Sequence, residues 1–284
     1  MKILVTGGKG FLGQHLVNGL RNRGEEVEVF DLPDDIRDFK LLKKRIKGKN
    51  LVWHAAAVAD LNFARRHDQE TFDINVQGTI NVAKACGENN VKLNYFSTCC
   101  VYGNQKIHPS NEESPTNPSE IYADTKLMGE YAIFGYSDLK RLKYNIVRLA
   151  TIYGPGMREA LGVHIFFNQA LSNNPITLHG NGRQTRTLTY IEDLIDGLIK
   201  MTYFKGDGEI FNLSAAEEIS AIEMARRIKK LTRSKSKIIH IPQRPGQTFK
   251  EQVSSKKAKK LLNWTAETSF DKGLIKTYEW FKNK

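Results

Sequence analysis

A tyrosine and a lysine four residues apart have the types and spacing to move a proton. Tyr122 and Lys126 fall in a stretch with a helical pattern, and residues four apart on a helix lie on the same face. A phenol with its ordinary pKa of about 10 is a poor base near neutral pH, and a neighbouring ammonium group lowers that pKa by stabilising the phenolate. The pair therefore predicts a tyrosine that accepts and returns a proton.

A third hydroxyl is expected beside this pair. Residues 93–97 form an apolar run typical of a buried strand, and Thr98 follows at its carboxyl end. Ligands of parallel sheets bind at this end of the strands. We therefore expect Thr98 to hydrogen-bond the same substrate oxygen as Tyr122, and we predict Thr98, Tyr122 and Lys126 as the catalytic residues.

The first residues of the chain predict the element that positions this chemistry. Residues 3–5 are a short apolar run, as in a strand covered on both faces. Gly7, Gly10 and Gly13 follow at three-residue spacing, with Phe11 and Leu12 opening a helical pattern. Such glycines allow a tight turn and a close approach of backbone to a pyrophosphate at the helix N-terminus. The stretch predicts a dinucleotide site.

An acidic residue after the second strand favours NAD over NADP. A strand is predicted over residues 27–30, and Asp31 follows it with no arginine directly behind. A carboxylate about 20 residues past the glycine loop accepts hydrogen bonds from a ribose diol and repels a 2′-phosphate. Residues 32–38 then lead directly into a helical stretch over residues 39–46. We therefore expect the next crossover and its strand to be deleted or reduced to a loop.

Composition limits the remaining classes of protein. The 284 residues carry a net charge of +12, and the basic residues are spread along the chain, densest on two amphipathic helical stretches. We read these as solvated faces, and we expect no nucleic-acid partner. Apolar runs are too short to span a membrane, and the first strand begins at once, which predicts a cytoplasmic enzyme. Neither the cysteines nor the scattered histidines have the spacing of a metal site.

Several motifs together resemble the extended short-chain dehydrogenase/reductase superfamily, in its branch of nucleotide-sugar epimerases and dehydratases. They are the glycine loop at residues 6–13, Asn75-Val-Gln-Gly-Thr, Tyr122-x-x-x-Lys126, and the stretches at residues 148–156, 180–186, 190–193 and 244–247. We expect an α/β fold with a Rossmann-type, doubly wound parallel sheet. Residues 1–155 would bind NAD, with residues 187–213 returning to that domain, and residues 156–284 would form a smaller substrate-binding domain.

The resemblance implies roles for individual residues. Arg186 and Arg244 would hold the diphosphate of the substrate, and Thr151 and Thr98 would contact its sugar, although Thr151 and Gln247 depart from the family's usual Asn and Asp. Asp35 and Ile36 would contact the adenine, and the small residues after the strand at residues 51–54 would let the backbone pass the cofactor. The predicted cofactor contacts are Gly7, Gly10, Phe11, Leu12, Gly13, Asp31, Asp35, Ile36, Ala55, Ala56, Ala57, Asn75, Tyr122, Lys126 and Ala150.

The two residues after Thr98 favour one reaction. In the family that the chain resembles, 4,6-dehydratases carry Asp-Glu at these positions and uronate decarboxylases carry Ser-Glu, whereas this chain has Cys99-Cys100. The absence of a carboxylate there disfavours dehydration and decarboxylation. We predict 4-epimerisation of a nucleotide-diphosphate sugar, of the UDP-glucose and UDP-galactose type. Tyr122 would take the proton of the 4-hydroxyl, and Lys126 would hold the nicotinamide ribose.

Three alternatives stay open at this point. Cys100 would act as an acid/base in a 3,5-epimerase, although Gly156, Met157 and Arg158 replace the further His or Lys of such relatives. A 4-ketoreductase would use the same residues with reduced cofactor from solution. In the third alternative, the chain is a nucleotide-binding regulatory protein that has lost catalysis.

Relatives dimerise through two helices, one of them bearing the tyrosine, and the apolar run at residues 127–136 leads us to expect a homodimer.

Overall fold

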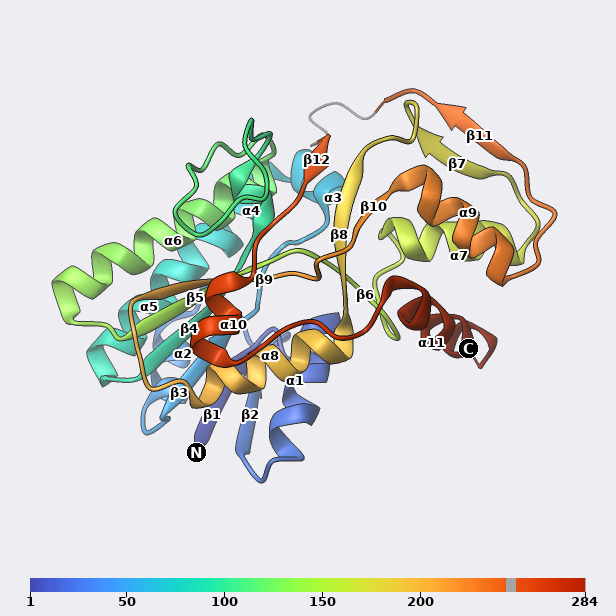
Figure 1. The fold of residues 1–284 in the computed structure, drawn as a ribbon. Helices are drawn as coiled ribbons and strands as arrows, with labels where there is room; N and C mark the ends of the chain where they lie inside the picture. Colours follow the sequence, from blue (N-terminus) through green and yellow to red (C-terminus); the bar gives the residue numbers. More distant parts are fainter. Residues whose placement is uncertain (244–248, 284) are drawn as a thin grey trace.

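A six-stranded parallel sheet forms the centre of the computed structural model, which describes residues 1–243 and 249–283 (Figure 1). The strands are ordered β2-β1-β3-β4-β5-β9, and every neighbouring pair is parallel. The predicted doubly wound parallel sheet is confirmed. The strands are β1 (Lys2–Thr6), β2 (Glu26–Phe30), β3 (Leu51–His54), β4 (Lys92–Thr98), β5 (Tyr144–Leu149) and β9 (Glu209–Leu213).

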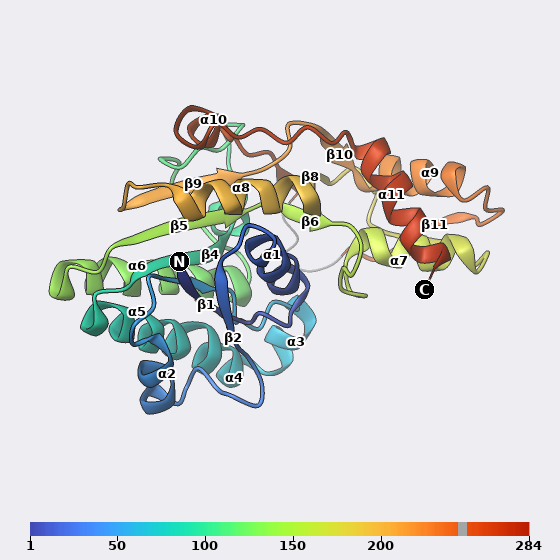
Figure 2. The same ribbon diagram turned by 90° about the horizontal axis from the view of Figure 1, so that it is seen from below.

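Helices cover both faces of this sheet, as Figure 2 shows. Leu16, Leu194 and Leu262 share one apolar cluster with the sheet, and Leu42, Val82 and Ile133 share another on the opposite face. Because both faces are buried, the inner strands read as nearly continuous apolar runs. The first face carries α1 (Phe11–Arg21), α8 (Ile191–Tyr203) and α10 (Lys256–Leu262), and the second carries α2 (Phe39–Ile46), α5 (Gly78–Asn89) and α6 (Ile121–Lys140).

The shortened segment after Asp31 is confirmed by the order of the strands. β2 lies at the edge of the sheet, and the chain passes from it through α2 directly to β3 on the other side of β1. Between β3 and β4 the chain is almost wholly helical. That stretch holds α3 (Leu61–Arg66), α4 (Asp68–Phe72), the π-helical turn η1 (Asp73–Gln77) and α5, and the 3₁₀ turn η2 (Cys99–Tyr102) follows β4.

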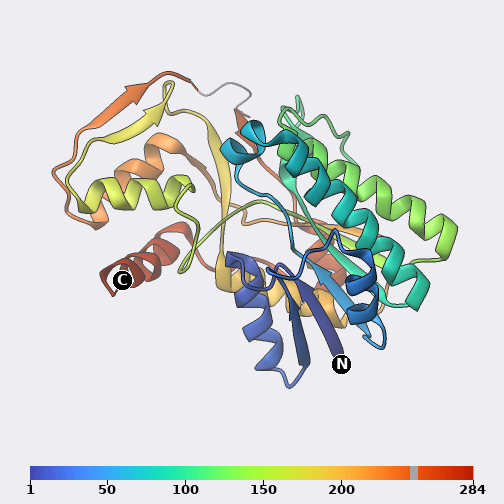
Figure 3. The same ribbon diagram turned by 180° about the vertical axis from the view of Figure 1, so that it is seen from behind.

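A second, smaller group of elements lies beside the carboxyl ends of the main strands (Figure 3). Its core cluster includes Tyr153, Phe167, Leu188 and Ile228. Strand β8 (Thr185–Tyr190) pairs with β6 (Thr151–Tyr153), β10 (Glu218–Ser220) and β12 (Lys250–Glu251), and β7 (Ile176–His179) pairs with β11 (Ile238–Ile241). The helices are α7 (Gly162–Leu171), α9 (Ala221–Leu231) and α11 (Phe270–Lys282).

The chain passes between the two groups more than once. After β8, α8 packs on α1 and β9 joins the main sheet, and α10 later packs on α8 and β9. Of residues 187–213, which we expected to return to the first domain, β8 instead lies in the smaller sheet. The division into a cofactor domain and a substrate domain stays a prediction.

Candidate active site

The carboxyl edge of the main sheet brings the predicted site residues together. Thr6 at the end of β1 is in register with His54 of β3, and Thr98 of β4 is in register with Leu149 of β5. The residues that follow these strand ends are the glycine loop, Ala55 and Ala150. Segments far apart in the sequence therefore meet at one edge, as parallel topology requires.

Two adjoining cavities at this edge hold almost every predicted cofactor contact. Both contain Gly7, Gly10, Ala55 and Ala57 in their walls. The inner cavity is further lined by Phe11, Leu12, Gly13, Thr98, Tyr122, Lys126 and Ala150, and the outer one by Asp31, Asp35, Ile36 and Ala56.

The glycine loop has the shape that a dinucleotide requires. Gly7 has a φ of +69°, and a Cβ there would lie 2.6 Å from the amide nitrogen of Ala56. A Cβ on Gly13 would overlap the carbonyl oxygen of Gly7. Gly10 caps α1 without any side-chain hydrogen bond, so the first amides of the helix remain for an anion. The loop fits the pyrophosphate of NAD.

Two carboxylates stand at the outer cavity. Asp31 accepts hydrogen bonds from the backbone amides of Lys9 and Leu32, each at 2.8 Å, which fixes its carboxylate at the edge of the sheet. Asp35 is paired with Arg37, whose Nε lies 2.9 Å from Asp35 Oδ2. The hydrogen bond from Arg37 holds the pKa of Asp35 below its ordinary value.

We expected Asn75 to contact the cofactor, but its side chain lies elsewhere. Its side chain is fully buried and lines neither of these two cavities. Asn75 Oδ1 accepts a hydrogen bond from the Val58 amide at 2.8 Å, and Nδ2 donates to Val58 O and Thr125 Oγ1, both at 3.0 Å. Asn75 therefore joins the loop after β3 to α6, and supports the cofactor cavity from behind.

Tyr122, Thr98 and Lys126 converge in the inner cavity. Burial raises the pKa of Tyr122 to about 12, opposed by the charge of Arg158 and by the neighbouring Thr98 hydroxyl. Lys126 is buried with its ammonium 4.2 Å from the centre of the Tyr95 ring, and burial lowers its pKa to about 7. Added positive charge beside the phenol is therefore required for base chemistry near neutral pH.

A buried ion pair fixes the helix that carries this tyrosine and lysine. Glu130 lies one turn after Lys126 on α6, and its carboxylate accepts two hydrogen bonds from Arg148 of β5, at 3.0 and 2.7 Å. Both side chains are almost fully buried. Arg148 also donates to the hydroxyl of Tyr102 at 3.0 Å. The pair joins α6 to the centre of the sheet directly below the site.

A second buried network lies under the glycine loop and was not foreseen from the sequence. His54 is fully buried, with Nδ1 2.7 Å from Thr6 Oγ1 and Nε2 3.0 Å from Thr79 Oγ1. Burial, reinforced by the charge of Lys126, lowers the pKa of His54 well below its ordinary value. A neutral imidazole therefore connects β1, β3 and α5. The isolated position of His54 in the sequence gave no signal of these partners.

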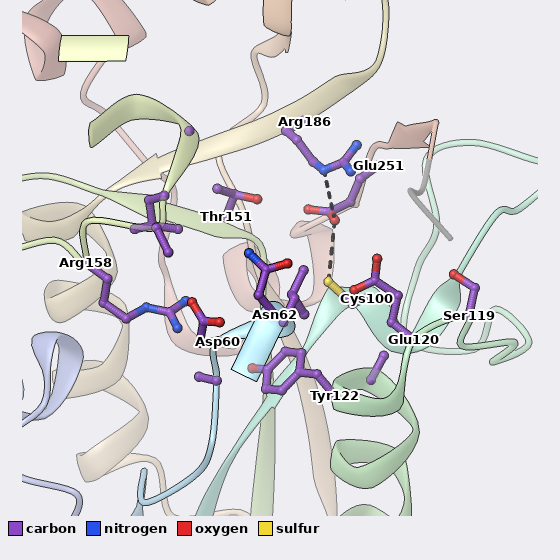
Figure 4. Close-up of a pocket in the computed structure, with 16 residues that line it drawn as sticks. Asp60, Asn62, Cys100, Ser119, Glu120, Tyr122, Thr151, Arg158, Arg186 and Glu251 are labelled. Carbon is purple, nitrogen blue, oxygen red and sulfur yellow. Dashed lines mark hydrogen bonds and ion pairs between the residues drawn. The ribbon is translucent and has the colours of Figure 1, made fainter. Parts of the chain in front are cut away.

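Charged side chains surround the space on the other side of Tyr122 (Figure 4). Thr151 and Arg186, both predicted to bind substrate, line it, whereas Arg244 lies outside the described residues. Arg186 Nε is 3.7 Å from Glu251 Oε2, and Arg186 Nη1 donates to the Thr185 carbonyl at 2.7 Å. The other polar residues of this cavity are Asp60, Asn62, Cys100, Ser119, Glu120, Arg158 and Glu251. We refer to it as the substrate cavity.

Two of these carboxylates were missed by reasoning from the sequence. We compared only the positions directly after Thr98 with the family's acidic residues, and the structure brings Glu120 from the start of α6 and Glu251 from β12. Strand β12 is two residues long, too short for a periodic pattern. Its register with β8, which sets Glu251 opposite Arg186, is visible only in the fold.

The two adjacent cysteines have different surroundings. Cys99 is buried in a small apolar cluster, in keeping with a packing role. Cys100 lines the substrate cavity, and its thiol donates to Glu251 Oε2 at 3.8 Å. Burial, with the charge of Glu251, raises the pKa of Cys100 to about 12. A thiol held protonated in this way is a poor base, which disfavours the 3,5-epimerase alternative.

The comparison with known protein families agrees with this geometry. Residues 3–214 match the model of the NAD dependent epimerase/dehydratase family. The chain belongs to this family. Its membership confirms the resemblance inferred from the motifs, and it confirms NAD as the cofactor at the level of the family. The glycine loop and the Tyr122–Lys126 pair are both inside the matched range.

Individual relatives of this protein are named for different reactions. A UDP-N-acetyl-alpha-D-glucosaminuronate decarboxylase of Bacillus cytotoxicus is 30% identical over 315 residues, covering 99% of this chain and 98% of the relative. The structure of a UDP-glucose 4-epimerase of Thermotoga maritima, solved with UDP-glucose, matches with a TM-score of 0.95 and 27% identity. A UDP-glucuronic acid 4-epimerase of Bacillus cereus, solved with UDP-glucuronic acid and NAD, matches with a TM-score of 0.94 and 28% identity. Each structural match covers 100% of this chain and 99% of the other.

Two further observations concern the described residues only. They contain no group of three or more His, Cys, Asp or Glu side chains placed to hold a metal ion. They also contain no helix with the length and apolar character needed to cross a membrane.

Proposed function

We propose that this protein is an NAD-dependent 4-epimerase of a nucleotide-diphosphate sugar, of the UDP-glucose and UDP-galactose type. The observation that carries the proposal is the position of Tyr122, which lines both the inner cofactor cavity and the substrate cavity, with Thr98 beside it in the inner one. A sugar hydroxyl at this boundary would meet the proton acceptor on one side and the cofactor on the other.

The residues of the chain have separate parts in this reaction. Tyr122 would accept the proton of the 4-hydroxyl, and Thr98 would donate to or accept from the same oxygen. The buried Lys126 would bind the nicotinamide ribose and add positive charge near the phenol. NAD supplies the acceptor for the hydride of carbon 4. After the 4-keto sugar turns within the cavity, the hydride would return to the opposite face of carbon 4 and Tyr122 would return its proton to the oxygen, which forms the other epimer.

The sugar and the diphosphate of the substrate would be held by the smaller group of elements. Thr151 borders both the cofactor and substrate cavities, in keeping with a contact to the sugar. Guanidinium groups suit a diphosphate because they are planar and always charged. Arg186 lies in the substrate cavity, and Arg244 falls outside the described residues, so these diphosphate contacts stay predictions.

Decarboxylation of a nucleotide-linked uronate is the second candidate. The relative from Bacillus cytotoxicus is named for that reaction, and Glu120 and Glu251 supply carboxylates to the substrate cavity although positions 99 and 100 do not. A decarboxylase would release CO₂ from UDP-glucuronate and form a pentose product. An epimerase would conserve all carbons.

We further propose that the enzyme is a homodimer joined through α6. This helix presents Met128, Tyr131 and Leu139 to solvent, with exposed fractions of 45%, 58% and 77%. Apolar side chains at such spacing form a stripe on one face of a helix. Light scattering of the purified protein should give twice the chain mass, and Tyr131→Lys should shift it toward one chain mass.

The experiment that tests the proposed function uses purified protein with UDP-glucose, UDP-galactose and UDP-glucuronate, each with and without NAD. Products are identified by NMR while absorbance at the reduced-nicotinamide band is recorded. We expect interconversion of 4-epimers with no net absorbance change. Net reduction of the added NAD would identify an oxidoreductase such as the ketoreductase running in reverse, release of CO₂ a decarboxylase, and no turnover of any sugar a regulatory protein.

A further inference from the structure

Glu251 places a buried carboxylate in the wall of the substrate cavity. Only 7% of the residue is exposed, although it belongs to a strand of two residues. The Cys100 thiol donates a hydrogen bond to Glu251 Oε2 at 3.8 Å, and Arg186 Nε lies 3.7 Å from the same oxygen. Figure 4 shows Glu251 between Arg186 and Cys100. Burial raises the pKa of Glu251, and the charge of Arg186 and the hydrogen bond from Cys100 oppose that rise.

The position of this carboxylate relative to the reacting group follows from a short chain of contacts. Tyr122 and Thr98 line the inner cavity together, and Thr98 Oγ1 accepts a hydrogen bond from the Cys100 amide at 3.2 Å. The Cys100 thiol then contacts Glu251. If carbon 4 of the sugar sits at Tyr122 and Thr98, then Glu251 faces the substituents of a neighbouring ring carbon.

Those substituents differ in charge between the two classes of substrate that relatives use. Carbon 5 of a hexose carries carbon 6, which is a neutral hydroxymethyl group in UDP-glucose and a carboxylate in UDP-glucuronate. A hydroxyl can donate a hydrogen bond to Glu251. A second carboxylate in the same buried space would be repelled by it, since like charges in a cavity of low dielectric interact strongly.

The nearest guanidinium does not remove this repulsion. Arg186 is paired with Glu251 through Nε, and its Nη1 is bonded to the Thr185 carbonyl. Asp60 and Glu120 add two further carboxylates to the cavity, against the one remaining guanidinium of Arg158. Among the described residues that line it, acidic side chains outnumber basic ones.

We propose that Glu251 makes the site selective for a nucleotide sugar with a neutral carbon-6 group, by accepting a hydrogen bond from its hydroxyl and repelling a uronate carboxylate. This inference rests on the proposed 4-epimerisation, since that reaction places carbon 4 at Tyr122. Rejection of the wrong substrate by an unfavourable contact is a general route to specificity.

The test compares the wild-type enzyme with Glu251→Gln, which removes the charge and keeps the size of the side chain. For each protein, kcat/KM is measured for 4-epimerisation of UDP-glucose and of UDP-glucuronate. The wild type should prefer UDP-glucose, and Glu251→Gln should lower this preference by about tenfold or more. Glu218→Gln is the matched control. Glu218 lies on β10, which is separated from β12 by β8, and it pairs with Lys250. It lines neither the substrate cavity nor the inner cofactor cavity, so its variant should keep the wild-type preference.

Two additional measurements separate this inference from the proposed function and from a folding defect. Glu251→Asp keeps the charge and should keep the preference for UDP-glucose. Calorimetric titration with UDP-glucuronate in the presence of NAD should show tighter binding to Glu251→Gln than to the wild type, whether or not any turnover occurs. A wild type that binds UDP-glucuronate in preference to UDP-glucose, or a Glu251→Gln variant with unchanged ratios of kcat/KM and Kd, would overturn the assignment of Glu251. If the predicted change in Kd occurs but no epimerisation is seen, only the proposed reaction would be overturned.

Discussion

The cofactor side and the substrate side of Tyr122 are built from different kinds of residue. On the cofactor side the inner cavity is lined mostly by glycine, alanine and apolar side chains, and its charged residues are Lys126, Arg158 and Glu251. On the substrate side, Asp60, Glu120, Arg158, Arg186 and Glu251 share one cavity. We expect the first side to recognise its ligand mainly by close approach of the backbone, and the second mainly by charge. Mutations should accordingly act through shape on one side and through electrostatics on the other.

The largest effect is expected where the two sides meet. Tyr122→Phe removes the hydroxyl that borders both cavities and leaves the ring in place. Because general acid–base catalysis contributes about 10²–10⁴-fold, kcat should fall by that order. The measurement is the initial rate of 4-epimer formation by NMR, with NAD affinity and thermal melting as controls that should not change. A variant that retains most of its activity would remove Tyr122 from the mechanism.

The next effect concerns the ion pair that holds the catalytic helix. Glu130→Gln leaves Arg148 buried without an anion, and breaking a buried pair costs about 3–5 kcal/mol of unfolding free energy. Glu279→Gln breaks an exposed pair with Lys282 and should cost less than about 1 kcal/mol. Urea unfolding monitored by circular dichroism compares the two. Equal losses would show that the buried pair does not anchor α6.

A smaller effect is expected from an added methyl group in the glycine loop. In Gly13→Ala the new Cβ would overlap the Gly7 carbonyl, so overpacking of about 1–3 kcal/mol and a clear loss of NAD affinity are expected. Gly135→Ala on α6 meets no atom within 4 Å and should be neutral or stabilising by up to about 1 kcal/mol. Calorimetry with NAD and thermal melts measure both. Normal NAD binding by Gly13→Ala would contradict recognition by close backbone approach.

A further expected effect is a pH dependence caused by Lys126. Burial lowers its pKa to about 7, from an ordinary value of 10.5, so between these values the unfolded chain binds more protons than the folded one. Stability from this group therefore rises with pH over that window. Without cofactor, the unfolding free energy of the wild type should rise relative to Lys126→Met between pH 7 and about pH 9.5. Parallel curves for the two proteins would show that Lys126 keeps an ordinary pKa.

The cofactor side could be predicted from the sequence almost residue by residue. Its loops follow strands that are each recognisable as short apolar runs, and parallel strands must bring their carboxyl ends to one edge. Asn75 is the informative exception, because its motif predicted contact with the cofactor whereas its side chain braces Val58 and Thr125.

The substrate side could be predicted only in part. Thr151 and Arg186 were found through motifs, but Glu120 and Glu251 carry no local pattern that connects them with Tyr122. Glu251 reaches the cavity because β12 pairs with β8, a contact between residues more than sixty positions apart in the chain. Charge complementarity of this kind depends on tertiary pairing, so the sequence could not show which acidic residues enter the site.

The most direct test of the central claim follows the hydrogen at carbon 4. UDP-glucose labelled with deuterium at that carbon is incubated with the enzyme and NAD in ordinary water, and the product is analysed by NMR and mass spectrometry. Transient oxidation predicts UDP-galactose that retains deuterium at carbon 4, with no net formation of reduced cofactor. Product in which that deuterium has been replaced by solvent hydrogen, or no 4-epimer at all, would contradict the proposed reaction.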